Sequence, residues 1–183
     1  MMGEQQTGIS ISQAAMKLGL ILGLYQTVKL MLLVIGLNKS AFSLLSLIAA
    51  AGVPFVAYHL VKRFRDNFAN DFFPFISAWI LSMLTFFFAT MIFSIAAYTY
   101  LNFADNGMLV NTIVEQMEAN KSLFTAEAPK EFNDIFDQSL EMVRNMNPLQ
   151  ITKTLISSAL LWGNIFSLII SIATARIKPI KRE

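Results

Sequence analysis

The residues of this chain that could take part in chemistry are few, and the most unusual ones lie inside apolar segments. Lys29 lies near the middle of an apolar run, and no acidic residue occurs in any of the long apolar runs to pair with it. A lysine at the centre of a membrane span costs about 2.5–3.5 kcal/mol on insertion scales. Gln26 lies one helical turn away, and Asn164 is expected at a similar depth in the last apolar run. Lys29, Gln26 and Asn164 are therefore the candidate intramembrane polar site.

Two interpretations of Lys29 are open at this stage. In the first, its ammonium group faces a cavity or an anionic ligand. In the second, the side chain extends toward the membrane surface, or bonds to carbonyl and amide groups inside the bundle. The second is the more common behaviour of a lysine in a span, and the sequence does not decide between them.

The remaining titratable residues form no catalytic or metal-binding pattern. His59 is the only histidine, and a single histidine cannot make a metal site. Two acidic pairs have i, i+3 spacing, but the alternating oxygen ligands of a calcium loop are missing. These pairs are Glu115 with Glu118 and Asp134 with Asp137. The chain has no cysteine, which excludes disulfides, thiolate metal sites and cysteine nucleophiles. We therefore expect no cofactor, no metal, no nucleic-acid partner and no enzymatic activity.

Composition and hydropathy predict an all-α, multi-pass membrane protein. The 183 residues are 55% hydrophobic and 14% charged, whereas soluble domains carry about 25% charged residues. The mean hydropathy is +0.56. The shortage of charge is concentrated in four segments, each long enough to cross the hydrocarbon core of a bilayer as a helix. The predicted spans, which should pack as a four-helix bundle, are residues 14–37, 41–61, 72–100 and 151–175.

The connections between the first three spans are short. Residues 38–40 form a minimal turn, so the first two spans are predicted to be antiparallel neighbours. Pro54 near the middle of the second span removes a backbone hydrogen bond and predicts a kink. Residues 61–71, with the sequence VKRFRDNFAND, are predicted to be a charged turn before the third span.

Residues 102–150 differ from the rest of the chain because acidic residues outnumber basic ones there. Apolar residues recur at helical spacing, which predicts two amphipathic helices joined near residues 123–128. Ala128-Pro129 marks the start of the second helix and Asn147-Pro148 marks its end. The apolar faces of this insert need cover from the membrane surface, from the bundle or from a docked partner.

The distribution of basic residues predicts the orientation. Lysine and arginine beside spans are retained on the cytoplasmic side. With four spans, the charged turn and the C-terminal tail lie on the same side, so both termini should be cytoplasmic and the insert extracytoplasmic. The residues that anchor this topology are Lys62, Arg63, Arg65, Arg176 and Lys178.

Small residues recur every four positions in the first and fourth spans. Such stripes let helix backbones approach closely and mark helix–helix contacts. The stripes are Ala15, Gly19 and Gly23, and Ala159, Gly163, Ser167 and Ser171. They predict that the first and fourth spans pack against each other, antiparallel. The alternative is that they form a surface for self-association.

Several features occur in the order that is typical of one protein family. They are the short first turn, the KRFRD segment at 62–66, the aromatic run from Phe68 to Trp79, the acidic insert, and the WGNIFSLII segment at 162–170. In these features the chain resembles a bacterial family of four-span membrane proteins, of the type common in Bacteroidetes, that is catalogued as a domain of unknown function. The resemblance implies an inner-membrane location and brings no activity.

Two functions are predicted from these observations. The first is a non-enzymatic subunit or accessory partner of a membrane complex, which contacts the lipid bilayer and either another membrane protein or further copies of itself. The alternative is a small oligomeric transporter or channel with a polar site around Lys29. A membrane enzyme is the weakest hypothesis, because the spans lack an acid pair, a histidine cluster and a Ser-His arrangement.

Overall fold

The computed structural model describes residues 10–38, 40–68, 72–121 and 129–176. Four long helices lie in these ranges: α1 (Ile11–Asn38), α2 (Ser40–Phe68), α3 (Phe75–Phe103) and α7 (Pro148–Thr174). Each is long and apolar enough to cross a membrane. Two shorter helices, α4 (Met108–Ala119) and α6 (Lys130–Arg144), lie between α3 and α7. The predictions of an all-α chain and of four apolar spans are confirmed.

The prediction of a charged turn at residues 61–71 is wrong over most of its length. Helix α2 continues through this segment to Phe68 and carries Lys62, Arg63 and Arg65 in its last turns. The segment contains no proline or glycine before residue 68, and its lysine and arginine residues have good helix propensity. Burial reinforces the helix, because Val61 is fully buried against the bundle.

The helix boundaries otherwise lie within a few residues of the predicted spans. Pro74 precedes the first residue of α3 and acts as its N-cap, where its missing N–H costs little. Asn147 caps α7 through a capping box with Gln150, and Pro148 follows as the first helical residue. Helix α2 continues on both sides of Pro54, where the kink was predicted.

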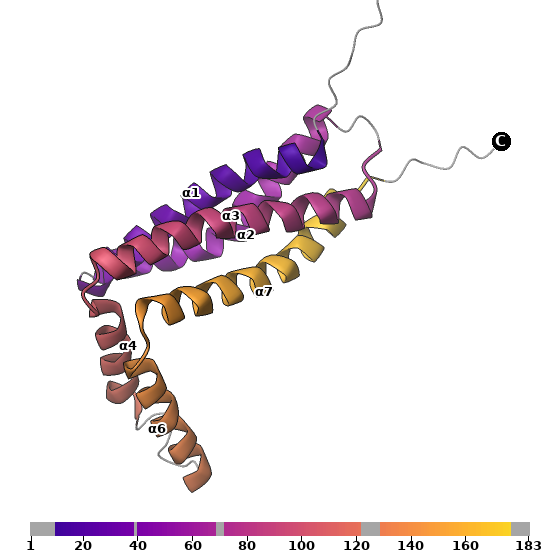
Figure 1. Cartoon of the computed structure of the whole chain (residues 1–183). Coiled ribbons are helices and arrows are strands. Elements are labelled where there is room, and N and C mark those ends of the chain that lie inside the picture. Colours follow the sequence, from indigo (N-terminus) through magenta and orange to yellow (C-terminus); the bar gives the residue numbers. More distant parts are fainter. Residues whose placement is uncertain (1–9, 39, 69–71, 122–128, 177–183) are drawn as a thin grey trace, which may run out of the picture.

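Helix α3 is the central element of the bundle, because α1 and α7 both pack along it. Helix α2 packs mainly on α1 and makes fewer contacts with α7. Figure 1 shows the four long helices side by side, with the ends of α2 and α7 near the start of α3. The buried face of α3 includes small residues, namely Ala78, Ser82, Thr85, Ala89 and Ala97. These small residues let both neighbouring helices approach closely.

The prediction that the first and fourth spans pack against each other is wrong, because the small residues of both spans contact α3. A Cβ atom at Gly19 would lie 2.6 Å from the Cβ of Phe88, and one at Gly23 would lie 2.9 Å from the Cβ of Ile92. A Cβ atom at Gly163 would lie 3.0 Å from the Cβ of Phe86. Each stripe therefore marks a close helix contact, and the small residues of α3 are the shared partner that was not predicted.

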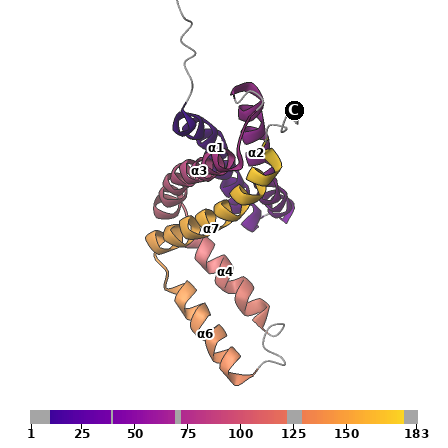
Figure 2. The same ribbon diagram turned by 90° about the vertical axis from the view of Figure 1, so that its right-hand side faces the viewer.

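Helices α4 and α6 form a hairpin that extends sideways from the end of the bundle opposite the start of α1 and the end of α7 (Figures 1 and 2). Arg144 of α6 pairs with Glu118 of α4 at 2.7 Å, and Asp137 of α6 pairs with Lys121, just after α4, at 2.6 Å. At the base of the hairpin, the buried Asp105 accepts a hydrogen bond from the N–H of Leu109 at 3.2 Å. The predicted junction at residues 123–128 lies outside the described residues.

Candidate functional site

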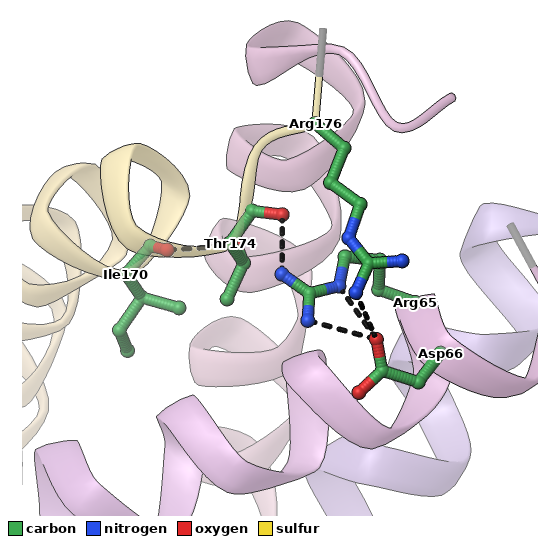
Figure 3. A network of polar contacts seen from close by, with 5 residues as sticks. All are labelled: Arg65, Asp66, Ile170, Thr174 and Arg176. Atoms are coloured by element: carbon green, nitrogen blue, oxygen red, sulfur yellow. Dashed lines mark hydrogen bonds and ion pairs between the residues drawn. The ribbon is translucent and has the colours of Figure 1, made fainter. Parts of the chain in front are cut away.

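Two features of the bundle could carry a function: a cluster of charged residues at one end and a cavity between the long helices. The end cluster is centred on Arg65, which is only 7% exposed. Its Nη1 donates a 3.0 Å hydrogen bond to the carbonyl oxygen of Thr174. Its Nε and Nη2 donate to Oδ1 of Asp66 at 2.9 and 2.8 Å. Figure 3 shows that Arg176 reaches the same carboxylate from the end of α7, at 3.2 Å.

A short backbone pairing extends this cluster to the start of α3. The N–H of Phe73 donates to the carbonyl oxygen of Arg176 at 3.1 Å, and the N–H of Arg176 donates to the carbonyl oxygen of Phe73 at 2.7 Å. We call the set of Arg65, Asp66, Phe73, Thr174 and Arg176 the clasp. It ties together the end of α2, the start of α3 and the end of α7.

The contacts of the clasp stabilise the fold. The last carbonyl groups of a helix have no intrahelical N–H partner and carry the negative end of the helix dipole. Arg65 satisfies one of them with a charged donor. Among the other predicted topology anchors, Arg63 is exposed, and Lys62 lies with its Nζ 5.7 Å from the ring centroid of Tyr58. Lys178 lies outside the described residues.

The cavity has a volume of about 430 Å³ and receives side chains from all four long helices. Its walls include Gln26 and Lys29 of α1, Ala50 and Val53 of α2, Phe86 and Phe93 of α3, and Ser158 and Trp162 of α7. The lining is thus mostly apolar and aromatic, with a few polar groups. This composition is typical of a binding site for a small molecule or a side chain.

Lys29 contributes the positive charge to this cavity. The residue is half-buried, and its Nζ lies 5.7 Å from the ring centroid of Phe93, a cation–π distance. Among the described residues, no carboxylate lies within ion-pair distance of Lys29. Gln26, one turn earlier on α1, is 6% exposed and lines the same cavity. The structure therefore brings together two of the three residues predicted as a polar site.

The third predicted residue, Asn164, does not belong to the site. It is exposed and is absent from the cavity walls, and its carbonyl oxygen accepts a hydrogen bond from Ser167. The cavity face of α7 is set by Ser158 and Trp162. Residue 164 lies about 200° around the helix from residue 162, taking about 100° per residue. Similar depth in the membrane was therefore an insufficient criterion, because Asn164 lies on another face of α7.

Pro54 interrupts the backbone hydrogen bonds of α2 next to the cavity. Because proline has no N–H, the carbonyl group of Ala50 has no donor at position 54. Ala50 and Val53 both line the cavity. At the preceding residue, the hydroxyl of Tyr25 donates a 2.8 Å hydrogen bond to the carbonyl oxygen of Ala49. This part of α2 thus combines a proline-interrupted backbone with a hydrogen bond to α1.

Sequence reasoning missed the aromatic part of the site. Trp162 was not predicted as part of the site, yet it lines the cavity, is 55% exposed and stacks on Phe166 with ring centroids 5.9 Å apart. Its place near the middle of a span was the available signal, since tryptophan in spans is concentrated at the membrane surfaces. Among the described residues there is no group of histidine, cysteine, aspartate and glutamate that could hold a metal ion.

Four apolar helices of membrane-spanning length, joined by short connections and one helical insert, define a multi-pass helical membrane protein. The chain belongs to the DUF4199 family, described as a protein of unknown function, whose model matches residues 17–176. No curated protein and no solved structure matches the chain significantly. The resemblance to a family catalogued as a domain of unknown function is confirmed, and the family brings no activity with it.

Proposed function

We propose that this protein is a non-enzymatic accessory subunit of a membrane complex, and that its cavity receives an acidic group from a transmembrane partner. The observation that carries the proposal is Lys29. Its side chain lies in the cavity inside the apolar part of the bundle, and the described residues supply no counter-charge.

The energetics favour a carboxylate as the group that Lys29 binds. An ammonium group at this depth has lost much of its hydration, and residues of this kind in spans usually face a cavity and pair with an opposite charge. A carboxylate hydrogen-bonded to Lys29 and Gln26 would offset the loss. The aromatic rings of Phe93 and Trp162 offer apolar surface to the segment that carries it.

The partner is proposed to be a different chain. No acidic residue occurs in the central parts of the four spans, so a second copy of this protein cannot bring a carboxylate to the depth of Lys29. This argument favours a hetero-complex over the homo-oligomer that the sequence analysis left open.

We further propose that the complex lies in a bacterial inner membrane with both termini of this chain in the cytoplasm. Support comes from the clasp end of the bundle, where Lys62, Arg63, Arg65 and Arg176 gather. Single-cysteine variants test the orientation, since the chain has no cysteine of its own. In intact cells, a membrane-impermeant maleimide should label Gln138→Cys on the hairpin and leave Arg63→Cys unlabelled. The reverse pattern would contradict the orientation.

Site-specific photo-crosslinking tests the accessory function. A photo-reactive amino acid at Ser158, on the cavity wall, should crosslink to one protein in native membranes. The same amino acid at Ile172, which is 73% exposed on α7 outside the cavity, serves as the control and should crosslink to lipid. Lipid adducts alone at both positions would argue against a protein partner.

Transport of an anionic solute is the second candidate function. Lys29 and Gln26 favour it, because both line the cavity within a membrane-spanning helix. Ionisable residues inside spans often mark the pathway of an ion or substrate. Purified protein in liposomes should then conduct an anion such as acetate, and Lys29→Met should abolish the flux. The accessory function predicts no flux for either protein, so the two candidates give opposite results.

A further inference from the structure

The apolar side of α6 is only partly covered by the rest of the chain. This helix has no fully buried residue. Phe132 is 43% exposed, Ile135 is 59% exposed and Met142 is 64% exposed. Other apolar residues of α6, such as Phe136 and Val143, are half-buried. The exposed residues form a continuous strip beside the part of α6 that packs on α4, since positions three or seven apart share a helix face.

The chain connection holds one end of α6 at the end of a span. Only residues 145–147 separate α6 from α7, and three residues reach about 10 Å at most. Asn147 fixes the start of α7, because its side chain accepts the N–H of Gln150 at 2.8 Å and its own N–H donates to the Gln150 side chain at 2.9 Å. Leu149, in the first turn of α7, is 50% exposed.

The direction of α6 is across the end of the bundle. Figure 1 shows α6 running sideways from the start of α7, on the side of α4 that faces the long helices. Figure 2, seen close to the direction of the bundle, shows the hairpin extending away from the four long helices. A helix that leaves a span in this direction follows the plane of the membrane surface.

We infer that α6 is an interfacial helix, with the strip of Phe132, Ile135 and Met142 inserted at the boundary between headgroups and acyl chains. Its polar side carries Asp134, Asp137 and Glu141, which would face water. Helices of this two-sided kind bury their apolar face about 5–10 Å into the boundary region. A lipid surface is favoured as the partner because only three residues join α6 to α7, whose exposed apolar surface begins with Leu149 in its first turn.

The charge of α6 specifies which lipid surface it fits. The helix carries four acidic residues, against two basic residues at its ends. Interfacial helices that depend on electrostatic attraction to anionic lipids are rich in lysine and arginine on the polar face. The strip on α6 should therefore insert through its apolar residues and through the connection to α7. Zwitterionic phosphatidylcholine should be sufficient.

Spin labelling of the full chain in phosphatidylcholine liposomes tests the inference, because a chain without cysteine allows clean single-cysteine variants. Each label is tested for collisions with oxygen, which concentrates in lipid, and with a water-soluble nickel chelate. Phe132→Cys, Ile135→Cys and Met142→Cys should collide more with oxygen than with nickel. Asp134→Cys and Glu141→Cys, on the polar side, should show the reverse order. Ile172→Cys on α7 provides the reference for a lipid-exposed label.

Two results would overturn the inference. Frequent collisions with nickel at all three strip positions would mean that the strip faces water. Rare collisions with both reagents would mean that protein, such as a second copy of the chain, covers it. Circular dichroism of each labelled variant checks that the helices are intact. The result of the spin-label experiment does not depend on the cavity. The proposed accessory function can therefore be disproved while the inference about α6 holds.

Discussion

Arg65 in the last turns of α2 donates a 3.0 Å hydrogen bond from its Nη1 to the carbonyl oxygen of Thr174 in the last turn of α7. The two residues are 109 positions apart in the chain. Because α2 and α7 otherwise make few contacts with each other, this bond is a main connection between them. The clasp therefore closes one end of the helix pair that flanks the cavity.

Removing the buried guanidinium should destabilise this end of the bundle. Arg65→Ala leaves the carbonyl oxygen of Thr174 without its charged donor, and hydrogen bonds to charged groups contribute about 1.5–3 kcal/mol. We expect a loss of stability in this range, measured by reversible unfolding in mixed micelles. Arg63→Ala is the matched control, because Arg63 is exposed on the same helix and should change stability little. Equal effects of the two variants would show that the clasp contributes nothing.

The contact between Tyr25 and Gly52 predicts non-additive mutations. The hydroxyl of Tyr25, which donates to the carbonyl oxygen of Ala49, occupies the space that a Cβ atom at Gly52 would need. Gly52→Ala should therefore displace Tyr25 and destabilise the protein. In a Tyr25→Phe background the space is free, and Gly52→Ala should be neutral or stabilising, because alanine favours helix over glycine by about 1 kcal/mol.

A double-mutant cycle measures this coupling. Stability is determined for the wild type, both single variants and the double variant under the same conditions. We expect Gly52→Ala to cost less stability in the Tyr25→Phe background than in the wild type. The interaction energy between the two substitutions should be about 0.5–3 kcal/mol. Strictly additive effects would contradict the contact between α1 and α2 at this position.

The capping box at the start of α7 should stabilise the junction between the hairpin and the last span. Asn147→Ala removes the side-chain acceptor of the Gln150 N–H, and loss of an N-cap typically costs about 1 kcal/mol. Hydrogen exchange should become faster in the first turn of α7 while the centre of the helix is unchanged. Asn145→Ala is the control, since Asn145 follows α6 and has no part in the capping box. Unchanged exchange in Asn147→Ala would contradict this role.

Hydropathy alone was sufficient to predict the four spans, because each is a long apolar run with few charged residues. The position of α7 was also predictable, since Asn147-Pro148 is a recognisable helix start. The end of α2 was not predictable in this way. Charged residues such as Lys62 and Arg65 were taken as the end of a helix, whereas their side chains let the helix continue, by packing on Tyr58 and by binding the end of α7.

The candidate site was only half predictable for a geometric reason. Gln26 and Lys29 lie on one helix, so helical periodicity places them on neighbouring faces. Residues on different helices share a cavity only when the helices have the right rotation about their axes. That rotation depends on the packing of Gly19, Gly23 and Gly163 on α3, whereas these stripes were predicted to pack on each other. The error in packing explains why Asn164 was chosen and why Ser158 and Trp162 were not.

The isolated protein should become more stable when Lys29 loses its charge. Lys29→Met removes the ammonium group from an apolar environment and keeps most of the side-chain volume, so we expect a gain of up to about 3 kcal/mol in the stability of the purified protein. Lys17→Met is the control, because Lys17 is exposed near the start of α1 and should show little change. A loss of stability in Lys29→Met would indicate that Lys29 already has a stabilising role within the chain.

The most direct test of the central claim is the yield of the crosslink from Ser158 to a partner protein in native membranes, compared between wild type, Lys29→Met and Lys29→Arg. Breaking a buried ion pair costs about 3–5 kcal/mol, so the yield should fall about tenfold or more in Lys29→Met when partner binding is limiting. Lys29→Arg, which keeps the charge, should retain most of it. An equal yield from wild type and Lys29→Met would contradict the proposal that Lys29 binds an acidic group of a transmembrane partner.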